Sequence, residues 1–77
     1  MVCIQVKAVE DEHDGCEYSC WNSAYGFEIK VDGVEDDALL PHASCCESEN
    51  FTAIDLANYI LEKARIHGAE NIHVEQA

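Results

Sequence analysis

One amphipathic helix is the feature that most constrains the fold of this 77-residue chain. Residues 52–67 carry apolar side chains at helical spacing. Thr52, followed three residues later by Asp55, has the pattern of a capping box, and Gly68 follows the last turn as a typical stop. A helix with one apolar side must bury that side against another element. We therefore expect it to lie on a sheet formed by the rest of the chain.

Alternating sequence patterns predict the strands of that sheet. Residues 2–9 and 25–31 alternate apolar with other side chains at a period of two, and Ile72 and Val74 repeat the pattern after the helix. A period of two is typical of a strand with one buried face. These segments therefore predict strands on both sides of the helix.

The intervening segments carry weaker signals. The Asp-Gly pair at 32–33 predicts a tight hairpin turn, followed by a charged edge strand within residues 34–40. Residues 17–21 predict a further short strand, and the acidic residues 10–15 predict a loop. The expected fold is a single domain over residues 1–77, in the α+β class. It has two layers, a mostly antiparallel sheet of about three to five strands with one helix (about 52–67) packed on one face, in the order β-β-β-β-α-β.

Charge is the strongest compositional deviation. Sixteen acidic residues face four basic ones, which gives a net charge of −12. Such a chain repels nucleic acid and anionic membranes, so neither is an expected partner, whereas a basic protein surface attracts it. Two simpler interpretations stay open, namely solubility and adaptation to high salt. The same repulsion makes a monomer the expected state, although a dimer through an uncharged strand or helix face stays open.

The acidic residues fall into three groups along the sequence. We expect them to bind the partner: Glu10, Asp11, Glu12 and Asp14; Asp32, Glu35, Asp36 and Asp37; Glu47 and Glu49. Reversing Asp36 and Asp37 to Lys is expected to weaken binding without unfolding the chain. The aromatic residues Tyr18, Trp21 and Tyr25 are either anchors for the same partner or part of the core of the sheet.

The cysteines and histidines allow a zinc site as an alternative. The segments "HDGC" and "HASCC" share one spacing, and the candidate ligands are His13, Cys16, Cys20, His42, Cys45 and Cys46. Neither segment contains a Cys-x-x-Cys pair, and buried cysteine is common as a small apolar residue. We expect packed, reduced thiols and assign neither a metal nor a cofactor.

No set of residues with complementary catalytic roles is visible, so we do not expect an enzyme. There is no phosphate-binding glycine loop, and the four glycines fit turns and caps. The sequence also has no long apolar run and no signal-peptide pattern at its start, so the expected location is the cytoplasm.

The small size, the acidity and the order of elements together resemble the nucleic-acid mimics of phages, in particular anti-CRISPR proteins. This resemblance implies a non-enzymatic inhibitor that covers the DNA-binding channel of a CRISPR effector subunit. The order β-β-β-α-β, with "GFEIKV" followed by a turn, is also similar to the partial ribonuclease-like domain of HicB-type antitoxins. The second resemblance implies a small protein-binding module instead.

Overall fold

The structure is a computed structural model that describes residues 1–13, 21–45 and 47–77. Its elements are β1 (Val2–His13), β2 (Asn22–Val31), β3 (Val34–Asp36), β4 (His42–Ala43), β5 (Ser48–Glu49), α1 (Ala53–His67), the short 3-10 helix η1 (Ala69–Asn71) and β6 (Ile72–Gln76). Four strands form one sheet in the order β3-β2-β1-β6, and β4 pairs with β5 in a second, two-stranded sheet. The α+β prediction is confirmed.

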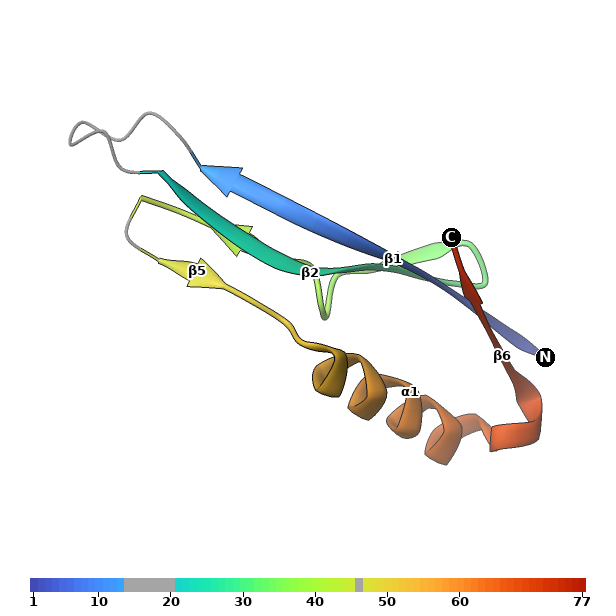
Figure 1. The fold of residues 1–77 in the computed structure, drawn as a ribbon. Coiled ribbons are helices and arrows are strands. Elements are labelled where there is room, and N and C mark those ends of the chain that lie inside the picture. Colours follow the sequence, from blue (N-terminus) through green and yellow to red (C-terminus); the bar gives the residue numbers. More distant parts are fainter. Residues whose placement is uncertain (14–20, 46) are drawn as a thin grey trace.

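The long hairpin of β1 and β2 is the central element of the fold. The two strands pair antiparallel without interruption from Ile4↔Val31 to His13↔Asn22, and β6 adds to the other side of β1 in parallel. Figure 1 shows α1 lying along only part of this hairpin, while the far end of the hairpin extends beyond the helix. The molecule is consequently elongated, with extents of 50 × 20 × 15 Å.

The turn between β2 and β3 is the one predicted from the Asp-Gly pair. Asp32 and Gly33 both have positive φ angles, 51° and 84°, as the tight turns favoured between paired strands require. The return strand is shorter than expected, because β3 ends at Asp36. The Asp36 carboxylate accepts a hydrogen bond from the Ala38 N–H, which bends the chain away from the sheet edge.

The core lies where α1 covers the sheet. Ile4 and Ile29 are fully buried on neighbouring strands, and Val6 and Leu39 complete the buried cluster. Half-buried side chains from the helix and its N-terminal side, among them Leu56 and Phe51, pack against this cluster. No residue of α1 is itself buried, so the helix covers the sheet incompletely.

The ends of the helix follow the sequence signals. The Thr52 hydroxyl accepts a hydrogen bond from the Asp55 N–H, and the Asp55 carboxylate accepts one from the Thr52 N–H at 2.7 Å. These reciprocal bonds satisfy two backbone donors that the first turn leaves unpaired. At the other end, the Gly68 N–H donates to the Ala64 carbonyl with a φ of 89°, which favours glycine.

Gly26 marks the point where the hairpin leaves the helix-covered part of the molecule. A Cβ atom at this position would lie 2.5 Å from the Leu39 carbonyl oxygen and 2.9 Å from Pro41 Cδ. The segment after β3 crosses the hairpin at this glycine, and the Phe27 N–H donates to the Leu39 carbonyl beside it. We call residues 9–13, 21–26 and 42–50, as far as they are described, the acidic arm, and the remainder the body.

Candidate functional site

The first acidic group lies in a strand and not in the predicted loop. Strand β1 continues to His13, so Glu10, Asp11 and Glu12 are all paired with β2. The loop prediction for residues 10–15 was wrong over residues 10–13, and residues 14 and 15 lie outside the described part. The strand tolerates these acids because their cross-strand partners are the uncharged Tyr25, Ala24 and Ser23, which avoids like charges directly opposite each other.

Asp11 has a structural role in the arm. Its carboxylate accepts a hydrogen bond from the Ala43 N–H at 2.8 Å, which fixes β4 against the hairpin. Its cross-strand partner Ala24 is fully buried, as is most of Ala43. Asp11 is therefore half-buried, and it holds the arm together more than it presents charge to solvent.

Two asparagines fix the rest of the arm. The Asn22 side-chain amide donates to the carbonyls of Ser44 and Glu47, at 3.0 and 2.7 Å. The Asn50 side-chain oxygen accepts from the Tyr25 N–H at 2.9 Å. The sequence analysis did not identify β4 or β5, since two-residue strands have no periodicity. The signal that was available is the asparagine at the start of β2, a residue that strands disfavour.

One face of the arm combines acids with large aromatic side chains. Glu10 lies directly opposite Tyr25, and Glu12 lies opposite Ser23, so these side chains share a face. Trp21 precedes β2 and is 61% exposed, while Tyr25 is 57% exposed. Of the three aromatic residues proposed as anchors, Trp21 and Tyr25 are thus surface residues and not part of the core. Tyr18 lies outside the described residues.

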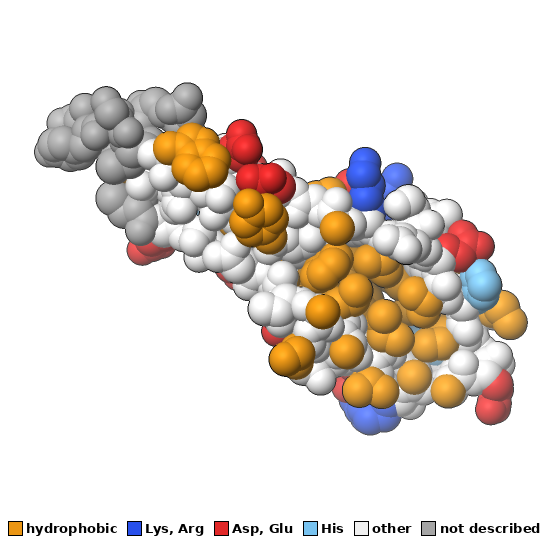
Figure 2. Space-filling model, viewed as in Figure 1, with side chains coloured by type: hydrophobic (Ala, Val, Ile, Leu, Met, Phe, Trp, Pro, Cys, Tyr) orange, Lys and Arg blue, Asp and Glu red, His pale blue; other side chains and the backbone are white. Residues whose placement is uncertain are grey.

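The third acidic group lies on the same arm as the first. Glu49 is paired with His42 across β4 and β5, and the Glu47 carbonyl accepts a hydrogen bond from the Asn22 side-chain amide. Glu47 and Glu49 therefore both lie on the arm. Glu10, Glu12, Glu47 and Glu49 are all exposed. The four Lys and Arg residues of the chain, Lys7, Lys30, Lys63 and Arg65, all belong to the body. On the face shown in Figure 2, the blue side chains accordingly lie away from the half that adjoins the grey segment.

The second acidic group lies at the opposite end of the hairpin. The Asp32 N–H donates to the Cys3 carbonyl, and the Asp32 carboxylate accepts from the Cys3 N–H, both at 2.8 Å. Cys3 lies seven residues before Glu10 on β1. At about 3.3 Å per residue this places the two groups about 23 Å apart. The three groups therefore form no single continuous surface. The structure brings together the first and third and separates them from the second.

The second group also carries more internal contacts. Glu35 lies across from Lys30 in the β2–β3 pair, and the Asp32 carboxylate accepts from the Cys3 N–H. Asp36 accepts a hydrogen bond from the Tyr59 hydroxyl at 2.5 Å, which ties β3 to the helix. Reversal of Asp36 would remove this acceptor, so the expectation that its reversal leaves the fold untouched is not supported. Asp37 is exposed.

The contact between Asp36 and Tyr59 perturbs both groups. The hydrogen bond from Tyr59 is the main cause that lowers the pKa of Asp36 below its ordinary value. Burial, followed by the hydrogen bond to Asp36, raises the pKa of Tyr59. Both shifts favour a charged carboxylate that accepts from a neutral phenol. The pair therefore acts as a structural link between the helix and the sheet edge.

The zinc alternative gains no support from the described residues. Within residues 1–13, 21–45 and 47–77, no group of three or more His, Cys, Asp or Glu side chains is arranged to hold a metal ion. Asp14, Cys16, Cys20 and Cys46 lie outside these ranges. Cys3 is a free thiol, whereas Cys45 is disulfide-bonded, so the structure differs at Cys45 from the reduced thiols expected in the cell.

Comparison with known proteins gives no match to any family model, curated protein or solved structure. No helix in the described part of the chain is both long and apolar enough to cross a membrane.

Proposed function

We propose that this chain is a non-enzymatic inhibitor whose acidic arm occupies a basic, nucleic-acid-binding surface of another protein. The observation that supports the proposal is the segregation of charge. The described residues of the arm carry Glu10, Asp11, Glu12, Glu47 and Glu49, and every Lys and Arg lies in the body. Interactions between charges are screened over about 8 Å at physiological salt. The Lys and Arg side chains of the body therefore neutralise the carboxylates at the far end of the arm poorly.

The exposed aromatics give the arm a means of binding beyond charge. Tyr25 lies opposite Glu10, Trp21 directly precedes β2, and both aromatic residues expose more than half of their surface. Trp and Tyr are the residues that most often dominate binding energy in protein interfaces. Acids would accelerate and orient the encounter with a basic groove, and the aromatic side chains would supply contact area once the arm is seated.

The proposed target is the DNA-binding channel of a CRISPR effector complex, as the resemblance to anti-CRISPR proteins implies. Such channels present Lys and Arg to a polyanion that carries one charge per roughly 1.7 Å of axis. A narrow, acidic arm on a folded body can compete for these side chains. The inhibitor and its target would have to share the cytoplasm, where the disulfide at Cys45 would meet a reducing environment.

A competition experiment tests the proposal. A purified effector complex is bound to a labelled target duplex, and release of the duplex is measured as the protein is added. We expect release that depends on the concentration of the protein and weakens steeply between roughly 50 and 200 mM salt. The double reversal E10K/E12K should abolish release, because it inverts the charge of the arm.

The matched control is E35K/D37K, which changes the net charge by the same amount at the opposite end of the hairpin. It should retain most of the inhibition. Equal loss from both double variants would show that only net charge matters, and no release of the duplex by the wild-type protein would contradict the proposal.

The element order favours a second candidate function. Apart from the two short strands β4 and β5 between β3 and α1, the strands β1, β2 and β3, the helix α1 and the strand β6 come in the order on which the resemblance to HicB-type antitoxins is based. On this alternative, the partner is a small basic toxin. A toxin gene beside the gene for this chain would favour the antitoxin, and co-expression should then yield a stable complex of the two proteins.

A further inference from the structure

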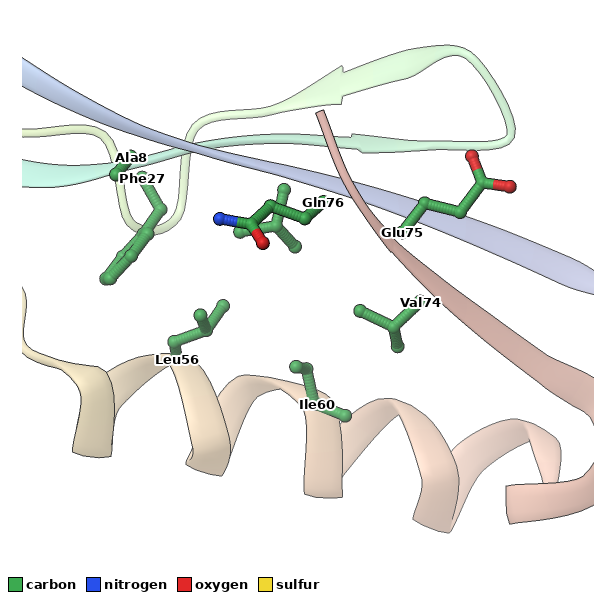
Figure 3. A pocket seen from close by; sticks show the side chains of 8 residues that line it. Ala8, Phe27, Leu56, Ile60, Val74, Glu75 and Gln76 are labelled. Carbon is green, nitrogen blue, oxygen red and sulfur yellow. The ribbon is translucent and has the colours of Figure 1, made fainter.

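The helix leaves an apolar cavity open at one side of the body. A cavity of about 260 Å³ lies between α1 and the sheet, lined by Leu56 and Ile60 of the helix, Phe27 of β2 and Val74 of β6. Figure 3 shows Val74 and Ile60 extending into the space between β6 and the helix, while Glu75 points away from it. The edge strand β6 therefore forms one wall of this cavity.

The helix is apolar beyond the side that contacts the sheet. Tyr59 bonds to Asp36 on the β3 side, Ala57 lies on the opposite flank, and helical spacing places Ile54 and Leu61 next to Ala57 but mostly turned away from the sheet. Ile54 is 72% exposed and Leu61 is 65% exposed. Figure 2 shows apolar side chains gathered in one large patch on the half of the molecule that contains the helix. A patch of this kind on a small protein indicates a contact surface.

The accessible area indicates how much surface is left to bury. The chain exposes 5249 Å², whereas a compact monomer of 8.6 kDa exposes about 4,700 Å². The elongated shape of the molecule and the helix, none of whose residues is buried, both leave surface exposed. The excess of about 500 Å² is a large share of the ~800 Å² that each partner contributes to a stable interface.

The edge of β6 is unpaired among the described strands, and its backbone is set up for pairing. The Ala77 N–H donates to the Val6 carbonyl at 2.8 Å, so alternate residues of β6, His73 and Glu75, also direct their backbone groups towards β1. Ile72, Val74 and Gln76 then direct theirs to the free edge. An added strand would meet three regularly spaced donors and acceptors.

We propose that this edge binds the same edge of a second copy of the chain, in an antiparallel pair centred on Val74. In this register Val74 lies opposite the partner's Val74, and Ile72 lies opposite the partner's Gln76, with all outward backbone groups hydrogen-bonded. His73 lies opposite the partner's Glu75 in a position without backbone hydrogen bonds, where side chains are closest. His73 Nε2 already lies 3.1 Å from Glu75 Oε1 of its own strand, so the two side chains can hydrogen-bond to each other.

The dimer also explains the apolar flank. A two-fold axis through Val74, perpendicular to the sheet, places both helices on the same face of one continuous sheet. The helix sides that carry Ala57 and Leu61 then approach each other across the axis, beside the two cavities. The acidic arms extend from the outer parts of the sheet. The like charges are therefore far from the contact, which contains one acid and one histidine per strand.

Sedimentation equilibrium of the full chain near 150 mM salt tests the proposal. We expect twice the chain mass of 8.6 kDa, with dissociation on dilution. V74K sets two lysines opposite each other and should raise the dissociation constant about tenfold or more. L61E should act in the same direction through the helix flank. The control is V34K on β3, where the wild-type side chain is 71% exposed, and it should have no effect.

Hydrogen exchange supplies a second readout that does not depend on variants. The amides of Ile72, Val74 and Gln76 should exchange slowly at high protein concentration and rapidly at low concentration. Those of His73 and Glu75 should be protected at both. A monomer at all concentrations, an interface that V34K weakens as much as V74K, or amide protection without this alternation would each overturn the proposal.

Discussion

The body and the acidic arm are built from the same two strands but are stabilised in different ways. In the body, Ile4 and Ile29 are fully buried under the helix. In the arm, the buried residues of the described part are the small Ala24, Gly26 and Ala43, and the layers are joined by hydrogen bonds that the Asp11 carboxylate accepts and the Asn22 amide donates. Burial of large apolar side chains is thus confined to one part of the hairpin, and the surface of the other part is available for charge and exposed aromatic residues.

The variant with the greatest expected loss of stability lies in the core of the body. I29A removes a fully buried side chain and should lower the free energy of unfolding by about 2 to 5 kcal/mol, measured by urea denaturation. The control is Y25A on the same strand, where the side chain is 57% exposed and the loss should stay below about 1 kcal/mol. Equal losses would show that the arm contains a core of its own.

The next largest effect concerns binding by the arm. W21A should weaken the affinity for the basic partner by about 2 kcal/mol, since an exposed Trp beside a charged surface is a typical anchor. Its free energy of unfolding should change by less than about 0.5 kcal/mol. Titration calorimetry and denaturation of the same variant separate the two quantities. Unchanged affinity would leave the aromatics without a role in binding.

A third variant tests how the layers of the arm are joined. D11A leaves the Ala43 N–H without its acceptor and should cost about 1 to 2 kcal/mol of stability. D11N keeps an acceptor oxygen while removing the charge, so it should cost less. If D11N is as harmful as D11A, the charge of Asp11 and not its hydrogen bond stabilises the arm.

The smallest effect depends on pH. Y59F removes the donor to Asp36 and should cost about 1 kcal/mol at neutral pH. The contact lowers the pKa of Asp36, so its contribution is present above the ordinary value of 3.8 and is lost as the pH falls through the lower pKa of the folded state. The stabilities of the wild type and Y59F should therefore converge below pH 3.8. A constant difference would contradict this assignment.

The helix and the main strands could be predicted because each has a local cause. Thr52 and Asp55 determine the start of the helix, and the Asp-Gly pair determines the turn, so nearby residues carry these signals. The β4–β5 hairpin and the extension of β1 to His13 depend instead on contacts between distant residues, such as Asp11 with Ala43. Local patterns do not encode such contacts, and acids in a row favour a loop by propensity alone.

The candidate site was predicted only in part for the same reason. The acidic groups were evident from composition, but their grouping depends on strand order. The parallel addition of β6 places the free edge beside the helix, and the β4–β5 hairpin carries Glu47 and Glu49 to the arm. Tyr59 could not have been assigned to Asp36 without knowing that β3 lies beside the helix.

The most direct test of the central claim compares the affinities of the two ends of the hairpin for a basic DNA-binding channel. Binding of E10K/E12K and of E35K/D37K to the same effector complex is measured at one salt concentration. The account predicts at least a tenfold loss for the arm variant, about 1.4 kcal/mol, and little change for the body variant. Equal losses, or a larger loss for the body variant, would contradict the assignment of binding to the acidic arm.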